Sequence, residues 1–210
     1  MSDLFPETVV ADRLRLVRAD ADDAGALDLY EHWRAGAPDI EETTEYVSWS
    51  PYDHPHGVAD TLERAADRTE DGEGAMYLLR PREGEANAGE FAGTTGLFVD
   101  WDSKVGVFGM WLRKSFWGRG YSGERADALF ELAFGRLDLD LVRVSHLPEN
   151  GSSERAITKY VERHGGRRAG RFRNRVAFDG GGVHDTIEYS VSQREWREAD
   201  GAETAVEFRR

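Results

Sequence analysis

The feature that most constrains this chain is a group of glycines between a strand-like and a helix-like stretch. WGRGYSG, residues 117–123, spells G-x-G-x-x-G from Gly118 through Gly120 to Gly123. Glycines let a backbone approach a ligand closely, and the first N–H groups of a following helix are free to bind an anion. The turn therefore predicts a pyrophosphate site, with a plain connecting turn as the structural alternative.

The same letters suggest a dinucleotide fold, but their context does not. That fold needs the glycines directly after its first strand, with an acid about 20 residues further on to bind a ribose. Here three strand-like stretches precede the motif, and residues 113–117 separate Leu112 from the first glycine. No acid follows the tip of the next strand until Glu149. A nicotinamide-dependent oxidoreductase is therefore the weakest of the function classes considered.

Hydrophobic periodicity gives the order β-α-α-β-β-β-α-β-α-β-β. The first helix is expected to be capped by Asp20 and to bury Ala24, Leu27, Tyr30 and Trp33. The helix after the glycines is expected to bury Ala126, Leu129, Phe130, Ala133 and Phe134. Strands are expected at residues 13–19, 75–83, 90–101, 105–114, 139–147, 171–178 and 185–192. This mixture indicates an α+β (mixed α/β) fold with helices on both faces of the sheet. The polar tail from 197 to 210 is expected to fray.

Composition limits the partners and the compartment. The 210 residues include no cysteine and no apolar run of membrane-spanning length, which favours one soluble cytoplasmic domain. The formal net charge is −13, and the lysines are Lys104, Lys114 and Lys159. Such a surface repels nucleic acid. It suits a halophilic protein that works in high salt, although an ordinary acidic protein has the same signature.

The sequence around the glycines resembles the GCN5-related N-acetyltransferase (GNAT) superfamily, in its branch of ribosomal-protein N-terminal acetyltransferase-like proteins. The branch has a strand ending in W-L, a W-G-x-G-Y turn and a later N-x-x-S, all present in WLRKSFWGRGYSGERADALFELAF and VRVSHLPENGSSERAITKY. The resemblance spans about residues 9–196. It implies a single domain over residues 1–196 with a mostly antiparallel sheet of about six to seven strands, split near its middle. It also implies acetyl-CoA as cosubstrate, an amine acceptor and a homodimer as one state of assembly. No metal is expected, because His54 and His56 have no further Cys or His at ligand spacing and indicate a plain loop.

The resemblance also assigns site residues. It implies that backbone groups of Trp111 and Leu112 bind the acetyl and pantetheine moieties, and that the pyrophosphate loop is Trp117, Gly118, Arg119, Gly120, Tyr121 and Ser122. Asn150 matches a residue that holds pantetheine, and the alternative is a helix cap. Ser153 is the candidate to assist the leaving thiolate, and the alternative is a simple helix-start residue.

The general base is the point at which the sequence departs from this family. The stretch VGVFGMWL has no glutamate, which many members carry on this strand. His146 is a candidate base near neutral pH, against a structural histidine. Further water-relay candidates are Asp53, His54, Asp100, Asp102 and Asp185. The function predicted is acetyl-CoA-dependent N-acetylation of a primary amine, either a protein N-terminus or a small amine. The alternative is a noncatalytic acyl-CoA-binding or regulatory module.

Overall fold

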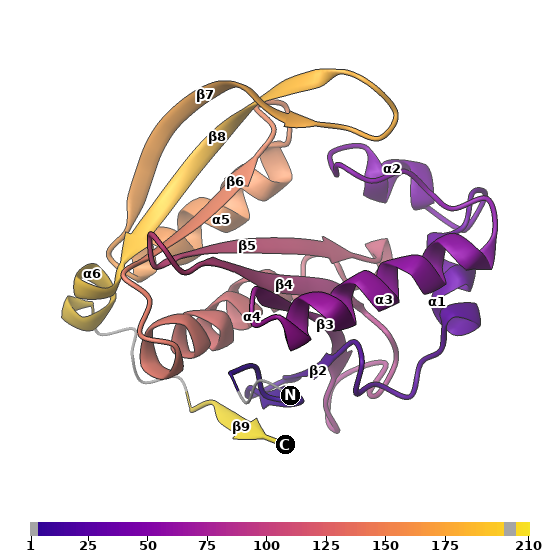
Figure 1. The fold of residues 1–210 in the computed structure, drawn as a ribbon, viewed down its shortest axis with the longest axis horizontal. Coiled ribbons are helices and arrows are strands. Elements are labelled where there is room, and N and C mark those ends of the chain that lie inside the picture. Colours follow the sequence, from indigo (N-terminus) through magenta and orange to yellow (C-terminus); the bar gives the residue numbers. More distant parts are fainter. Residues whose placement is uncertain (1–3, 200–204) are drawn as a thin grey trace.

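The sheet holds the molecule together. The computed structural model describes residues 4–199 and 205–210, and within them nine strands form one open sheet in the order β7-β8-β6-β5-β4-β3-β2-β1-β9 (Figure 1). The strands are β1 Thr8–Val10, β2 Leu14–Arg18, β3 Gly74–Pro81, β4 Gly93–Asp100, β5 Val105–Leu112, β6 Leu141–His146, β7 Arg167–Ala177, β8 Val183–Ser192 and β9 Glu207–Arg209. The mixed fold class is confirmed, but the expected six to seven strands are too few.

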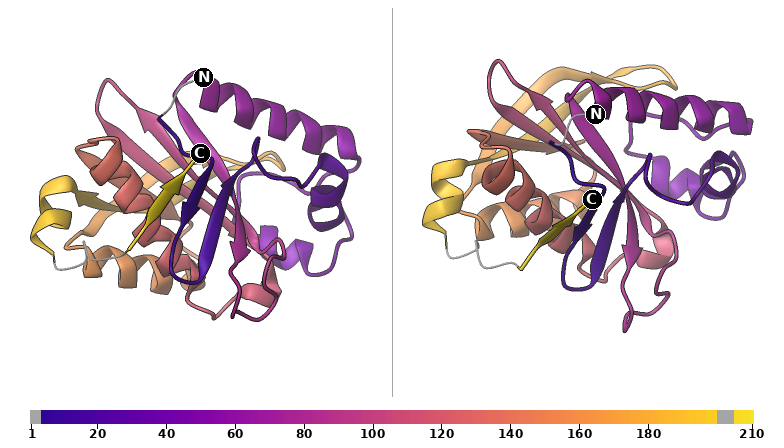
Figure 2. Two further views of the ribbon diagram at one scale, coloured as in Figure 1. Left: turned by 90° about the horizontal axis from the view of Figure 1, so that it is seen from below. Right: turned by 60° about the horizontal axis from the view of Figure 1, so that its bottom comes forward.

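The helices lie on both faces of this sheet, as Figure 2 shows. They are α1 Ala26–Trp33, α2 Ile40–Thr44, α3 Pro55–Glu70, α4 Tyr121–Phe130, α5 Gly151–Arg163 and α6 Gln193–Glu198. A short 3-10 helix, Lys114–Phe116, precedes α4, and a π-helical segment, Glu131–Arg136, follows it. None of the helices in the described part of the chain is long and apolar enough to cross a membrane.

Strand alternation builds a separate core on each face. In β3, Leu78 packs into a cluster with Leu29, Trp33 and Val58 from α1 and α3. Its neighbour Tyr77 points the other way, into a cluster with the buried faces of α4 and α5. Because both faces are covered, nearly every side chain of the central strands is at least half-buried.

The central helix agrees with its sequence pattern, whereas the first helix does not. All five apolar residues expected on the buried face after the glycines are buried. The first helix begins after Gly25, and the carboxylate of Asp20 instead accepts a hydrogen bond from Arg18 Nε at 2.6 Å. With this later start, Leu27 is 68% exposed rather than buried.

The two additional strands lie at one edge of the sheet. Thr8–Val10 pairs antiparallel with β2, and Glu207–Arg209 pairs antiparallel with Thr8–Val10. Part of the tail that was expected to fray is therefore a strand. Each of these strands has three residues, which is too short for an alternating pattern to be recognised in sequence.

Candidate active site

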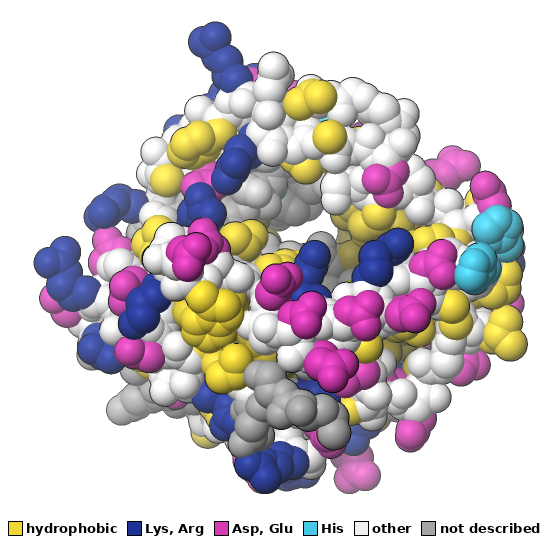
Figure 3. Space-filling view, in the orientation of Figure 1, with side chains coloured by type: hydrophobic (Ala, Val, Ile, Leu, Met, Phe, Trp, Pro, Cys, Tyr) yellow, Lys and Arg dark blue, Asp and Glu magenta, His cyan; other side chains and the backbone are white. Residues whose placement is uncertain are grey.

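A gap between β5 and β6 opens the sheet at its centre. These neighbours are parallel and pair over only three positions, from Val105↔Leu141 to Val107↔Arg143. Beyond Val107 the two strands diverge, while β5 stays paired with β4 to Leu112. Figure 1 shows the divergence, and Figure 3 shows a hollow at the corresponding place, with Lys or Arg side chains at its edge.

The divergence leaves one edge of β5 without a strand partner. The N–H of Arg113 donates to Ala92 in the direction of β4, at 3.0 Å. Successive residues of a strand direct their backbone groups to opposite sides, so those of Trp111 also face β4, whereas those of Met110 and Leu112 face the gap. The backbone groups of Leu112 and Met110 therefore line the gap, whereas those of Trp111 point away from it.

The glycine turn follows the free end of β5 after the short 3-10 helix Lys114–Phe116. Gly118 and Gly120 have φ values of 74° and 82°, in the left-handed region that favours glycine, and Gly120 is the N-cap of α4. Trp117 folds back over the strand end, and its Nε1 donates to Leu112 O at 3.0 Å. Among the described residues, the backbone N–H groups of residues 118–122 have no hydrogen-bond acceptor. They form a row of free donors at the positive end of a helix.

Side chains of the turn hold its shape and leave the backbone donors available. Arg119 donates to Ala86 O at 3.1 Å and to Asn87 Oδ1 at 3.2 Å, so its charge is directed away from the row. The Tyr121 hydroxyl donates to Glu85 Oε2 at 2.8 Å, and burial together with that carboxylate raises the pKa of Tyr121. Ser122 is half-buried in the first turn of α4.

Arg13 and Glu124 tie this turn to the start of β2. Glu124 accepts hydrogen bonds from the backbone N–H groups of Arg13 and Leu14, at 2.6 and 2.9 Å, and from Arg13 Nε at 2.9 Å. Arg13 Nη1 in turn donates to Arg119 O at 3.1 Å. A carboxylate in the first turn of α4 thus fixes the loop through an arginine more than a hundred positions earlier.

Three candidates lie on the opposite side of the gap, at the end of β6 and the start of α5. His146 is 6% exposed, its Nδ1 lies 2.8 Å from Leu147 O, and its Nε2 has no partner among the described residues. Asn150 caps α5, because its Oδ1 accepts from the N–H of Ser153 at 2.9 Å. The cap interpretation of Asn150 therefore describes its role in this structure, and Ser153 keeps its hydroxyl available in the first turn.

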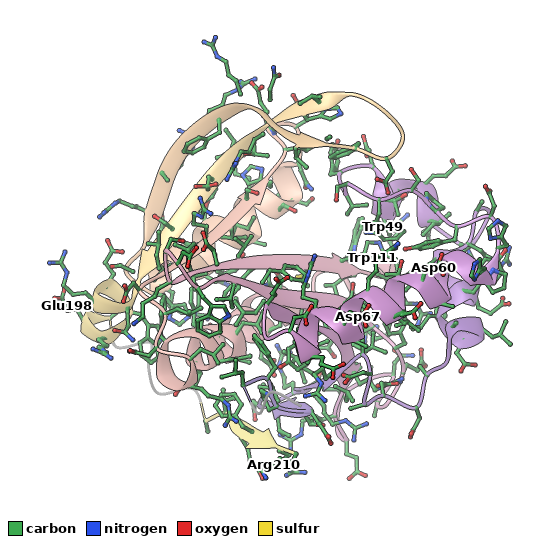
Figure 4. All side chains as sticks on the ribbon, viewed as in Figure 1. Trp49, Asp60, Asp67, Trp111, Glu198 and Arg210 are labelled. Carbon is green, nitrogen blue, oxygen red and sulfur yellow. The ribbon has the colours of Figure 1, made fainter. Side chains whose placement is uncertain are left out.

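A group of aromatic rings covers the other face of the sheet beside β5. Trp111 packs edge-on against Trp33 and Trp49, with ring centroids 6.3 and 5.8 Å apart, and Trp49 stacks on Tyr52 at 6.1 Å. Figure 4 shows Trp49 and Trp111 side by side above α3. Trp49 and Tyr52 are half-buried, so they both pack against the core and line its surface.

Two of the other polar candidates, Asp185 and Asp100, are used structurally. Asp185 accepts from Arg171 Nε at 2.9 Å and from the N–H of Asn174, which lowers the pKa of Asp185. Hydrogen bonds from Ser103 likewise lower the pKa of Asp100. His54 is the N-cap of α3. No cluster of three His, Asp or Glu side chains suited to a metal occurs in residues 4–199 and 205–210.

Sequence comparison assigns this architecture to a family. The family model described as acetyltransferase (GNAT) domain matches residues 13–160, from β2 through the glycine turn to α5. That match covers more than half of the chain. The chain belongs to the GNAT acetyltransferase family. Its members transfer acetyl groups, so the protein is an N-acetyltransferase by family, as the resemblance implied.

Individual relatives are distant in sequence and similar in fold. The uncharacterized N-acetyltransferase p20 of Bacillus licheniformis is 25% identical over 148 residues, which is 70% of this chain and 77% of that protein. Mycobacterium smegmatis RimJ, solved with CoA-disulfide, superposes with a TM-score of 0.76 at 15% identity, covering 96% of this chain and 94% of that one. RimL, described as a ribosomal L7/L12 alpha-N-protein acetyltransferase and solved with coenzyme A, gives 0.72 at 18% identity, covering 89% and 98%. The GNAT prediction is confirmed by the family model, and these structures share the fold of this chain.

The sequence analysis of this GNAT protein missed one residue at the gap. Arg125, in the second turn of α4, is 2% exposed and contacts Met110 of β5 and Tyr160 of α5. A signal was present in the sequence, since Arg125 lies four residues after Tyr121 and four before Leu129, on the apolar stripe of the helix. An arginine on a core-facing stripe is rare enough to attract attention.

Proposed function

We propose that this GNAT protein uses acetyl-CoA to acetylate a primary amine. The observation that carries the proposal is the row of free N–H groups at residues 118–122, placed where the unpaired edge of β5 ends. A pyrophosphate fits a helix N-terminus of this kind, because backbone donors and the helix dipole act together on an anion. A Cβ placed on Gly118 would meet nothing within 4 Å, so the approach to the row is open.

The gap suits the remainder of such a ligand. A pantetheine arm carries amide groups, and the gap edge of β5 offers it the N–H and C=O of Met110 and the N–H of Leu112, whose carbonyl already accepts from Trp117 Nε1. Bound acetyl-CoA would supply an activated acyl group to an amine. A backbone N–H directed into the gap is placed to stabilise negative charge that develops on the acyl oxygen.

Proton transfer is assigned to groups from β6 and α5. If Nδ1 of His146 donates to Leu147 O, the lone pair of Nε2 is free to accept a proton from the amine, directly or through water. The Ser153 hydroxyl, next to the capped start of α5, is proposed as a donor toward the leaving sulfur. Asn150 orients that first turn through its hydrogen bond to Ser153.

The first experiment is calorimetric titration of the folded protein with acetyl-CoA and, in parallel, with NAD. Gly120→Trp fills the turn, since even a Cβ there lies 3.3 Å from Arg13 Nη2. Gly181→Trp is the matched control, because Gly181 also has a positive φ, 95°, and open space around it. Acetyl-CoA binding that is lost only in Gly120→Trp supports the proposal. No binding to the folded wild type refutes it, and NAD binding would restore the dinucleotide interpretation.

Turnover then separates an enzyme from a binding module. A panel of small primary amines and of peptides with free N-termini is incubated with acetyl-CoA, and release of free thiol is followed. RimL is described as an alpha-N-protein acetyltransferase, so we propose a peptide α-amine as the first class of acceptor. Tight acetyl-CoA binding without acetylation of any amine would instead support the noncatalytic acyl-CoA-binding module.

The surface charge leads to a proposal about the cellular environment. A net charge of −13 suits a saline cytoplasm, where salt screens repulsion between carboxylates over a few Å. The melting temperature should then rise with KCl up to about 1 M, where the screening length falls to about 3 Å. A melting temperature that is independent of salt would favour an ordinary acidic protein.

A further inference from the structure

Arg125 is a buried cation that has no anionic partner among the described residues. Its side chain is 2% exposed, and no carboxylate of the described residues lies within ion-pair distance of it. Nε lies 3.2 Å from Met110 Sδ, and Nη2 donates to the Tyr160 hydroxyl at 3.4 Å. Nη1 has no hydrogen-bond partner among the described residues.

The guanidinium lies under the gap between β5 and β6. Its contacts on β5, Phe108 and Met110, both come after Val107, the last residue of β5 that pairs with β6. Its third contact, Tyr160, belongs to α5, the helix that follows β6. Arg125 thus touches both sides of the divergence, on the face of the sheet that carries α4 and α5.

A site of this composition is unfavourable for an arginine without a ligand. The guanidinium stays charged in proteins, and burial removes its hydration. The rings of Phe108 and Tyr160 lie 5.6 and 5.5 Å from its Cζ and stabilise the charge in part. They accept no hydrogen bond from Nη1, so a donor and a positive charge remain for an anion. Burial raises the pKa of Tyr160, which keeps that hydroxyl protonated and neutral.

We propose that Arg125 is the charge partner of the thiolate that leaves during acyl transfer. The inference rests on the proposed function. As the amine nitrogen forms its bond to the acyl carbon, the carbon–sulfur bond breaks and its electron pair stays on sulfur. The amine gives up one proton to His146 or to water. Arg125 transfers no proton, because its own proton is held too tightly, and acts by placing a positive charge beside the new anion.

A spectroscopic titration tests this without any turnover. Free coenzyme A is bound to the protein, and the ultraviolet absorbance of its thiolate is followed between about pH 6 and pH 10, around the ordinary thiol pKa of about 8.5. We expect the bound thiol to titrate at least one pH unit lower, a tenfold preference for thiolate. Binding of coenzyme A near neutral pH should also release protons, whereas binding of desulfo-coenzyme A should not.

Three variants assign the shift to Arg125. Arg125→Met should abolish the shift in the thiol pKa of bound coenzyme A, while acetyl-CoA, a neutral thioester, should still bind. Arg125→Lys should keep part of the shift. Arg155→Met removes the same charge from an exposed site on α5 and should leave the shift intact. If Arg125→Met does not fold, the wild-type titration and the proton release still test the proposal, because both measure whether the thiol pKa of bound coenzyme A is lowered.

The outcomes that overturn the proposal differ from those that overturn the function. Coenzyme A that binds the wild type with an unshifted thiol refutes the role of Arg125 and leaves acetyl transfer standing. A shift that persists in folded Arg125→Met refutes it as well. The wild type could also prefer a succinyl donor to an acetyl donor, and Arg125→Met could lose that preference. Arg125 would then bind the carboxylate of the acyl group instead of the sulfur. Failure of coenzyme A and acetyl-CoA to bind at all would refute the proposed function itself.

Discussion

Replacing Glu124 by alanine removes the carboxylate that ties α4 to β2 beside the glycine turn. Three hydrogen bonds end on that carboxylate, two from backbone N–H groups and one from Arg13 Nε. The Glu124 side chain is 10% exposed and that of Arg13 is 37% exposed, so the ion pair is partly screened and contributes little. The backbone donors of Arg13 and Leu14, bonded to a charged acceptor, contribute about 1.5 kcal/mol or more each. Allowing for water that enters the space, we expect a loss of about 2–4 kcal/mol.

Urea unfolding followed by tryptophan fluorescence measures this loss. With an m value of about 2–3 kcal/mol/M, the midpoint should fall by about 1 M at an unchanged slope. The matched control is Glu154→Ala, which removes an exposed acid from the first turn of α5 and so has the same relation to a helix dipole. We expect the control to change stability by no more than about 0.5 kcal/mol.

The same variant links stability to the site. Because Arg13 also holds the carbonyl of Arg119, loss of Glu124 should loosen the glycine turn and weaken acetyl-CoA binding, with Glu154→Ala unaffected. A loss of less than about 0.5 kcal/mol in Glu124→Ala would refute the reasoning, since it would mean that water replaces all three hydrogen bonds without cost.

Other substitutions give equally specific expectations. Gly93→Ala should prevent folding or cost more than about 4 kcal/mol, because its Cβ would overlap the Trp111 carbonyl and lie 2.8 Å from Leu112 Cα. Gly118→Ala has open space and should cost only the strain of a positive φ, about 1–2 kcal/mol, so thermal unfolding of the pair separates clash from strain. Burial opposes ionisation of Asp22, but hydrogen bonds from Arg80 at 2.5 and 2.7 Å outweigh it and lower the pKa below 3.8. This lowered pKa stabilises the fold above about pH 4, and the stabilisation is lost as the pH falls through the pKa of folded Asp22. Asp22→Asn should therefore be less stable than the wild type at pH 7, and its stability should fall less in acid. An acid profile unchanged in Asp22→Asn would contradict this. Asn150→Ala should cost about 1 kcal/mol in thermal unfolding through loss of the α5 cap, and Asn150→Asp should restore it.

The first helix and the edge strands show where sequence reasoning fails. Asp20 is a good cap residue, but its carboxylate pairs with Arg18, and the helix begins five residues later than the pattern indicated. Arg18 is only two residues from Asp20, but its guanidinium is held by a contact outside this segment, since Nη1 donates to Phe5 O at 2.6 Å. The strand at Glu207–Arg209 likewise exists because β1 offers it an edge, a contact between opposite ends of the chain that no local pattern contains.

The sequence by itself determined the strand, glycine turn and helix at the centre of this protein. Those elements depend on local causes: the conformations open to Gly118 and Gly120, and a helical stripe of apolar residues from Ala126 to Phe134. Only the tertiary structure decided which backbone groups face the gap, and that Arg125 lies beneath the gap with no anionic partner among the described residues. Each of these depends on where β6 leaves β5 and α5 packs on α4, because long-range packing brings together residues that are distant in sequence.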